Sequence, residues 1–137
     1  MTKIRTGKFD GHAADVLVID DDEDVRWALL ELLQLLGFVA VGASNGAEGL
    51  RLASERTPRL ILLDLRMPIM NGWQFLQHRR QNAKLSNIPV AVVTAEPSGT
   101  MIDPDVQALL CKPIGEEELR AALDRLMVAP RAEVTSA

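Results

Sequence analysis

The sequence predicts an α/β domain in which a parallel sheet of five strands is covered by helices on both faces. Short runs of valine, isoleucine and leucine alternate along the 137 residues with segments of helical periodicity. This alternation is typical of βαβ units, whose connecting helices pack on the two faces of a sheet. The chain contains no internal repeat, so we expect one domain at residues 15–127. Residues 1–14 and 128–137 are predicted to be flexible terminal segments.

Each predicted strand is a short, mostly apolar run of the kind that is buried on both faces of a parallel sheet. The runs are residues 16–19, 39–43, 60–63, 90–93 and 108–111. The single cysteine, Cys111, ends the last run, and its apolar neighbours predict a buried small hydrophobe and not a redox thiol.

The first two helices are predicted from periodicity and from capping residues. Apolar side chains recur at helical spacing after the first strand until Gly37, which ends that helix. Asn45, with Glu48 three residues later, predicts a capping box that opens the second helix. This helix ends before Pro58, because proline disfavours helical backbone at the preceding residue.

The remaining connections differ in their helical content. Residues 72–83 read as a third helix, and residues 116–126 as a last one, whose acidic first turn suits the helix dipole. Between them, residues 95–105 carry two prolines and a glycine among polar residues. Because each proline removes a hydrogen-bond donor, we expect a loop there with a short or irregular fourth helix.

Charged and hydroxyl side chains follow the predicted strands at their carboxyl ends. Asp20 and Asp21 follow the first strand, Asp64 the third and Lys112 the last, while Thr94 ends the fourth. The carboxyl ends of parallel strands meet along one edge, where open α/β sheets keep their ligand sites. We therefore expect these five residues to form a single site.

The chemistry of these residue types predicts a magnesium-dependent phosphoryl site. Crowded carboxylates repel one another, and Mg²⁺ is usually held by one or two carboxylates together with water and phosphate oxygens. Lys112 offers a compact positive charge and Thr94 a hydroxyl donor to the same oxygens. Such a set can stabilise a phosphoryl group in transfer. Asp64, alone opposite the acidic pair, is the predicted nucleophile.

Several other classes of protein are disfavoured. The acidic first turn, residues 20–24, would repel a dinucleotide, and no phosphate-binding P-loop sequence occurs. A net charge of −4 without a basic cluster argues against a nucleic-acid surface. One cysteine and two unclustered histidines, His12 and His78, give no disulfide and no zinc site. No apolar run suits a membrane span or a signal peptide, so we expect a cytoplasmic protein.

At these positions the chain resembles the receiver domain of bacterial two-component response regulators. The resemblance is carried by four segments in order, at residues 16–22, 62–72, 92–95 and 112–113. They include the stretch Asp64-Leu65-Arg66-Met67-Pro68 and the pair Lys112-Pro113. The family fold is a flavodoxin-like (βα)5 sheet of order 2-1-3-4-5, and the resemblance implies that fold here.

The resemblance also implies a role for each site residue. Asp64 would accept a phosphoryl group from the phosphohistidine of a histidine kinase or phosphotransfer protein. Asp20, Asp21 and Asp64, with the backbone carbonyl of Arg66, would hold Mg²⁺. Thr94 and Lys112 would contact the phosphoryl oxygens, and the Lys112–Pro113 bond would be cis. The chain would be a phosphoacceptor that assists its own phosphorylation and dephosphorylation, and not an enzyme acting on a separate substrate.

Two departures from the family pattern concern the signal output. The switch position that usually holds tyrosine or phenylalanine, and that works with Thr94, is Leu109 in this chain. The interval from Thr94 to Lys112 is also about one helical turn short. These departures predict a monomer whose activation does not use the aromatic rotation common in the family.

Three functional hypotheses follow. The first is a stand-alone receiver that signals by contact with a downstream protein, with neither nucleic acid nor membrane as a direct partner. The second is a degenerate receiver that acts as a phosphorylation-independent binding scaffold. The third is a small Mg²⁺-dependent phosphatase with an aspartyl-phosphate intermediate, for which Asp20 and Asp22 imitate the paired acids.

Overall fold

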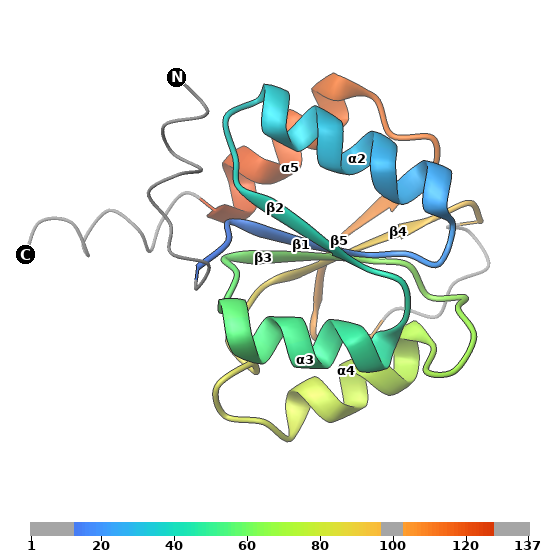
Figure 1. Cartoon of the computed structure of the whole chain (residues 1–137), viewed down its shortest axis with the longest axis vertical. Helices are drawn as coiled ribbons and strands as arrows, with labels where there is room; N and C mark the ends of the chain where they lie inside the picture. Colours follow the sequence, from blue (N-terminus) through green and yellow to red (C-terminus); the bar gives the residue numbers. More distant parts are fainter. Residues whose placement is uncertain (1–12, 97–102, 128–137) are drawn as a thin grey trace, which may run out of the picture.

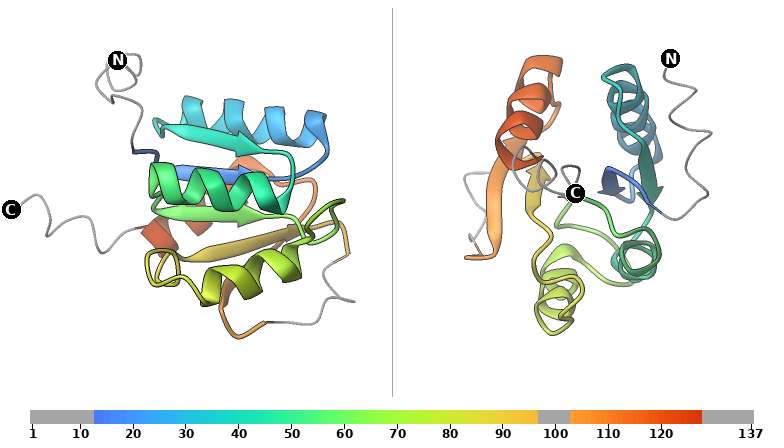
Figure 2. Two further views of the ribbon diagram at one scale, coloured as in Figure 1. Left: turned by 60° about the horizontal axis from the view of Figure 1, so that its bottom comes forward. Right: turned by 90° about the vertical axis from the view of Figure 1, so that its left-hand side faces the viewer.

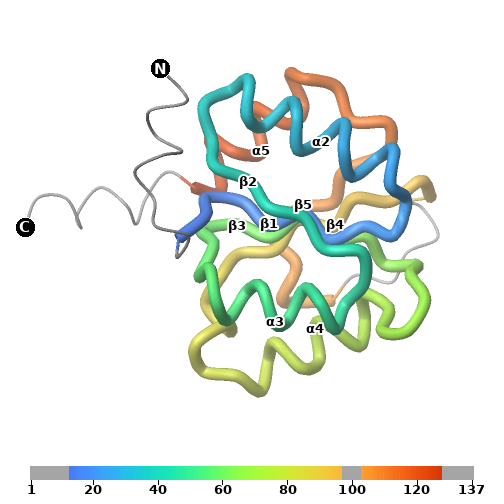
Figure 3. The backbone as a smooth tube through the Cα atoms, in the orientation of Figure 1, coloured from blue at the N-terminus to red at the C-terminus, as the bar shows by residue number. Residues whose placement is uncertain are grey.

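The computed structural model describes residues 13–96 and 103–127, and these form one parallel sheet with helices on both faces. The strand order is β2-β1-β3-β4-β5, which confirms the predicted doubly wound topology. The strands are β1 (Val16–Ile19), β2 (Ala40–Ala43), β3 (Leu60–Leu63), β4 (Val90–Thr94) and β5 (Val106–Cys111). In Figure 3 the chain runs from β1 outward to β2 and then returns across β1 to β3.

The described residues contain four helices, which cover the sheet in two pairs. Helices α2 (Glu23–Leu35) and α5 (Glu116–Met127) lie on one face, and α3 (Gly46–Arg56) and α4 (Gly72–Arg80) lie on the other (Figure 1). Alternate strand residues supply the two apolar layers: Leu17 and Ile61 face α3 and α4, whereas Val18 and Leu62 face α2 and α5. Burial on both faces explains why the strands are continuous apolar runs.

The capping residues correct one prediction. Asn45 caps α3 and accepts the Glu48 N–H, but the Glu48 carboxylate does not return to the Asn45 backbone as a capping box requires. It accepts the Ser44 N–H and hydroxyl instead, at 2.8 and 3.1 Å, because Ser44 offers two donors. The bond to the Ser44 backbone lowers the pKa of Glu48. The reciprocal capping box occurs at α4, between Asn71 and Gln74.

Helix α4 ends at Arg80, three residues before the predicted end. The Arg79 side chain is buried and donates to the carbonyls of Ser86 and Ile88, which hold the chain in turns after the helix. Arg80 bonds Asp103 and Asp105 at 2.7 Å each. These ion pairs join the end of α4 to the segment that enters β5, which begins two residues earlier than predicted.

The terminal segments and the fourth connection are described only in part. Ala14 belongs to the packed domain, since it is buried and its N–H donates to the Arg56 carbonyl. Of the predicted short helix at 95–105, residues 97–102 lie outside the described residues, as do residues 1–12 and 128–137. Residues 95–96 and 103–105 are not helical. Among the described residues no helix is long and apolar enough to span a membrane.

Cys111 is exposed, so its predicted burial is wrong. The reason is its place in the sheet: β5 is the edge strand (Figure 2), and Cys111 is the last residue of that strand. An edge strand has a neighbour on one side only, and its final side chain lies beyond the core.

The loop between β3 and α4 contains a strained turn at Ile69. The Met70 N–H donates to the Pro68 carbonyl at 2.7 Å, and Ile69 between them has φ 68°. This is the conformation of a γ-turn with positive φ, which is rare and strained, and a β-branched residue is poorly suited to it. The Ile69 side chain is 81% exposed, so packing does not compensate for the strain.

Replacing Ile69 with glycine should therefore stabilise the protein. Relief of a strained backbone is worth roughly 1–3 kcal/mol, and the added freedom of the unfolded glycine chain offsets part of it. We expect a net gain of about 1 kcal/mol in urea unfolding. Ile69→Val, which keeps the branched side chain, is the matched control and should change little. A loss of stability in Ile69→Gly would show that the turn is not strained.

Candidate functional site

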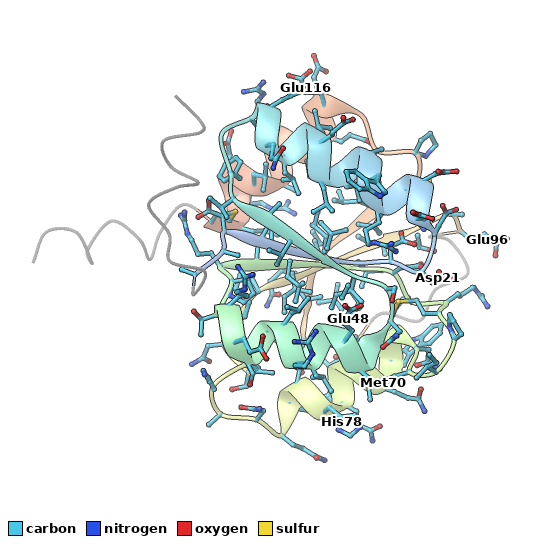
Figure 4. The ribbon with its side chains drawn as sticks, in the orientation of Figure 1. Asp21, Glu48, Met70, His78, Glu96 and Glu116 are labelled. Atoms are coloured by element: carbon cyan, nitrogen blue, oxygen red, sulfur yellow. The ribbon has the colours of Figure 1, made fainter. Side chains whose placement is uncertain are left out.

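Three carboxylates meet at the carboxyl ends of β1 and β3. These strands pair in parallel with Ile19 opposite Leu63, so the next residues, Asp20 and Asp64, emerge side by side. The Asp64 N–H donates to the Ile19 carbonyl at 2.9 Å. Carboxylate oxygens of Asp20, Asp21 and Asp64 all lie within 4.8 Å of one another. Asp20 and Asp64 are buried, whereas Asp21 is exposed at this edge of the sheet (Figure 4).

Lys112 reaches this cluster from the end of β5. Its Nζ lies 2.8 Å from Asp20 Oδ2 and 3.7 Å from Asp64 Oδ1. Its backbone N–H donates to the Thr94 carbonyl, and the Lys112–Pro113 bond is cis, as the resemblance implied. Burial alone would lower the pKa of Lys112, but the hydrogen bond and charge of Asp20, with the charge of Asp64, raise it. Lys112 is therefore held as a cation.

Asp20 is the most constrained acid of the cluster. Its Oδ1 accepts the Asp22 N–H at 2.9 Å, while its Oδ2 faces Lys112. Its backbone carbonyl accepts a bond from the Arg26 guanidinium at 2.8 Å. Arg26 was not among the predicted site residues, because a charged residue on a helix offers no pattern that connects it to a strand end six residues earlier.

Asp64 carries unbalanced negative charge. Its burial and the nearby Asp20 raise its pKa to about 6, and Asp21 adds to this. The Lys112 charge and the Arg66 backbone act in the opposite direction without cancelling the rise. One lysine thus does not neutralise three acids. Hard oxygen ligands with excess negative charge suit a divalent cation such as Mg²⁺, so the residues present fit the predicted metal.

Beside Asp64 lies a cavity of about 440 Å³, here called the Asp64 cavity. It is lined by Asp64, Arg66, Thr94, Ala95, Glu96 and Lys112. The Thr94 side chain is buried at its wall, and its hydroxyl oxygen accepts the Glu96 N–H at 3.2 Å. Since the oxygen acts as acceptor there, the hydroxyl proton remains free to be donated into the cavity.

The structure thus brings together all the site residues predicted from the strand ends. Asp20, Asp21, Asp64 and Lys112 are in one cluster, with Thr94 at the wall of the adjoining cavity. Leu109 is set apart from them, since it packs against the apolar layer on the side of α3 and α4. Its predicted part in switching stays a prediction.

A second cavity, also of about 440 Å³, adjoins the site on the side of α2. Its walls include Val25, Leu29 and Leu32 of α2 together with Pro113 and Ile114, and it shares Lys112 with the Asp64 cavity. This cavity was not predicted from the sequence, because the apolar positions of α2 predicted only a helix face packed against the core.

Comparison with known proteins gives one family and many relatives. The family model of the response regulator receiver domain matches residues 16–124. Protein PilH of Pseudomonas aeruginosa is 30% identical over 118 residues, which cover 83% of this chain and 98% of that protein. The transcriptional regulatory protein PrrA of Mycobacterium tuberculosis is 38% identical over 119 residues, which cover 82% of this chain. The match spans only 49% of PrrA.

Solved structures with the same fold include a chemotaxis protein and a kinase receiver domain. The chemotaxis protein CheY4 of Vibrio cholerae is 26% identical with a TM-score of 0.72, over 83% of this chain and 98% of that one. The receiver domain of a sensor histidine kinase from Pseudomonas aeruginosa PAO1 has a TM-score of 0.77 at 21% identity, over 84% and 98% of the two chains. That structure has a magnesium ion coordinated in its active site cleft.

Proposed function

Because this chain belongs to the response regulator receiver domain family, we propose that it accepts a phosphoryl group on Asp64 and signals through protein contacts. The observation that supports this proposal best is the position of Asp64. Its buried carboxylate forms part of the wall of an open cavity that Lys112 and Thr94 also line, and the Lys112 ammonium lies 3.7 Å from Asp64 Oδ1. A phosphoryl group on Asp64 would lie within reach of both donors.

In the proposed reaction, an Asp64 carboxylate oxygen attacks the phosphorus of a phosphohistidine. The new O–P bond forms as the P–N bond to the imidazole breaks, and the imidazole nitrogen keeps the electron pair. Lys112 and Thr94 stabilise the phosphoryl oxygens by charge and by hydrogen bonding. Asp20 orients Lys112 through the 2.8 Å bond to its ammonium.

The metal proposed for this site is Mg²⁺. Asp20, Asp21 and Asp64 would hold it with the Arg66 backbone carbonyl, in keeping with the 4.8 Å carboxylate cluster. When bound, Mg²⁺ neutralises charge on the phosphoryl oxygens. The receiver domain of known structure with a magnesium ion in its cleft supports the assignment.

The proposed partners are a histidine kinase or phosphotransfer protein as donor and a downstream protein as target. The family and the matches to short segments of a sensor histidine kinase and a hybrid signal transduction histidine kinase support a role in two-component signalling. PilH is matched over nearly its whole length, which favours a stand-alone receiver, whereas PrrA is matched over about half. We propose a monomeric, cytoplasmic phosphoacceptor and not an enzyme with a separate substrate.

The phosphatase alternative is disfavoured by the environment of Asp20. That hypothesis makes Asp20 the nucleophile, yet its side chain is 2% exposed and does not line the Asp64 cavity. Both its oxygens already accept bonds, from Lys112 and from the Asp22 N–H. A nucleophile needs a lone pair that faces the space where the substrate binds, and Asp64, which lines the cavity, meets this need better.

Incubation with acetyl phosphate and Mg²⁺ should add one phosphoryl group to the protein, detected by intact mass. Asp64→Asn should abolish the addition, because the amide lacks the nucleophilic carboxylate. Asp124→Asn, on the exposed face of α5, is the matched control and should be phosphorylated like the wild type. A wild-type mass that stays unchanged while Mg²⁺ binds would favour the scaffold hypothesis.

A further inference from the structure

The Arg26 side chain links helix α2 to the end of strand β1, beside the acidic cluster. Its guanidinium Nη1 donates to the Asp20 carbonyl at 2.8 Å. The Ile19 carbonyl, one residue earlier, accepts the Asp64 N–H, but among the described residues no backbone N–H donates to the Asp20 carbonyl. Arg26 therefore supplies a bond that the sheet does not provide at this position.

Close packing against strand β2 holds the apolar part of the Arg26 side chain. A methyl group added at Gly42 of β2 would come within 3.1 Å of Arg26 Cδ and 3.2 Å of its Cγ. The charge of Arg26 also reaches helix α3, where it adds to the lowering of the Glu48 pKa that the bond to the Ser44 backbone mainly causes. The half-buried guanidinium is thus held in place by contacts with several elements.

The bond to the Asp20 carbonyl fixes the peptide unit that leads to Asp21. A peptide unit is planar, so a carbonyl held in place also sets the position of the next Cα. Asp21 is exposed, yet its carboxylate lies within 4.8 Å of those of Asp20 and Asp64. We propose that Arg26 is a positioning residue that holds Asp21 in the geometry that Mg²⁺ requires. This inference rests on the metal site of the proposed function and adds to it a determinant of Mg²⁺ affinity.

The identity of the metal determines how much this positioning matters. Mg²⁺ demands near-ideal octahedral geometry, with bonds of about 2.0–2.1 Å, whereas Ca²⁺ accepts longer bonds in a more flexible arrangement. Groups that orient a metal ligand from behind typically change metal affinity by about 10–100-fold. Loss of the Arg26 bond should therefore weaken the binding of Mg²⁺ more than the binding of Ca²⁺.

The charge of Arg26, taken alone, predicts the opposite effect on affinity. A cation near an acidic metal site repels a divalent metal ion, so removing that cation should strengthen metal binding. Weaker Mg²⁺ binding after the loss of this positive charge would therefore distinguish positioning from electrostatics.

The test is the dissociation constant (Kd) of Mg²⁺, measured by isothermal titration calorimetry without any phosphoryl donor. Arg26→Met keeps an apolar side chain over β2 but removes the donor, so its Kd should rise about 10–100-fold, with a smaller rise for Ca²⁺. Arg26→Lys keeps a charged donor and should recover part of the loss. Arg51→Met removes an exposed cation from α3 and is the matched control, which should bind Mg²⁺ like the wild type.

Gly42→Ala is a second variant, which disturbs Arg26 without replacing it. The added methyl group would meet Leu30 Cδ1 at 3.0 Å as well as the Arg26 side chain, so it should displace the guanidinium and also raise the Kd. Combined with Arg26→Met, it should raise the Kd no further, because the donor is already absent. Urea unfolding shows whether each variant is folded, and Gly42→Ala decides the question if Arg26→Met does not fold.

Equal Mg²⁺ affinities in the wild type and both single variants, or tighter binding by Arg26→Met, would show that Arg26 does not position the site. The proposed function would then stand without this inference. A wild type that binds no Mg²⁺ would overturn both the inference and the proposed metal. A wild type that binds Mg²⁺ but takes up no phosphoryl group from acetyl phosphate would overturn the proposed function, while the comparison of Kd values would still decide the role of Arg26.

Discussion

Lys112→Met should destabilise the metal-free protein by about 2–4 kcal/mol and should reduce phosphoryl uptake at least 100-fold. Lys112 is the cation within 2.8 Å of the buried Asp20, and it also faces Asp64 at 3.7 Å. Breaking a buried ion pair by removing one partner typically costs about 3–5 kcal/mol. The Lys112 side chain is 19% exposed, so solvent screening lowers the expected cost to about 2–4 kcal/mol, slightly below that range. Uptake falls because the phosphoryl oxygens lose their ammonium donor.

Urea unfolding in the presence of a chelator measures the loss of stability, and acetyl phosphate labelling measures uptake. Lys84→Met is the matched control: the Lys84 side chain is exposed and its ammonium bonds the Ser54 carbonyl at the surface, so its loss should cost under about 0.5 kcal/mol. Mg²⁺ should restore part of the stability of Lys112→Met, because it supplies positive charge to the same acids. A variant as stable as the wild type without metal would show that Lys112 does not balance Asp20.

Metal-free wild-type protein should become less stable as the pH rises from about 4 to above 6, and Mg²⁺ should reverse the loss. The pKa of Asp64 is raised in the fold from its ordinary 3.8 to about 6 by burial and by Asp20. A raised pKa means that the folded state binds the proton on Asp64 more tightly than the unfolded state does. The stabilisation from this proton is therefore fully present below about pH 4 and is lost as the pH rises through about 6. The full change corresponds to about 3 kcal/mol.

Thermal and urea unfolding across this pH range, with chelator or with Mg²⁺, test the prediction. Asp64→Asn should remove the part of the pH dependence that Asp64 contributes without metal, since the amide does not ionise. Above pH 7, Mg²⁺ at 100 times its Kd for the wild type should stabilise the wild type by about 3 kcal/mol. The same Mg²⁺ concentration should stabilise Asp21→Ala far less. A metal-free stability that stays flat between pH 4 and 7, or equal Mg²⁺ responses in the two proteins, would contradict the assignment.

The sequence by itself determined the fold class and which residues lie together in the candidate site. Apolar runs such as Leu60–Leu63 are too short for helices and too continuous for strands with an exposed face. They therefore had to be strands of a covered parallel sheet. In such a sheet all carboxyl ends share one edge, so residues as distant in sequence as Asp20, Asp64 and Lys112 converge without further information.

The tertiary structure decided how these residues are paired. Lys112 bonds Asp20 at 2.8 Å and stays 3.7 Å from Asp64, which leaves Asp64 with a raised pKa and an open cavity beside it. The sequence placed three acids and a lysine together but gave no order among them. Differences of about 1 Å between ion pairs depend on strand spacing and on loop bonds such as that from Arg26 to the Asp20 carbonyl.

Other features were also beyond the sequence because they depend on contacts between distant segments. Cys111 is exposed since it ends β5, the edge strand among the described residues. Arg79 is buried since it donates to the carbonyls of Ser86 and Ile88, and Ile69 takes a strained turn. Local periodicity reports which side of a strand or helix is apolar. It does not report which strand lies at the edge, which charge is satisfied or which loop is strained, because each of these is fixed by neighbours that only the folded chain brings together.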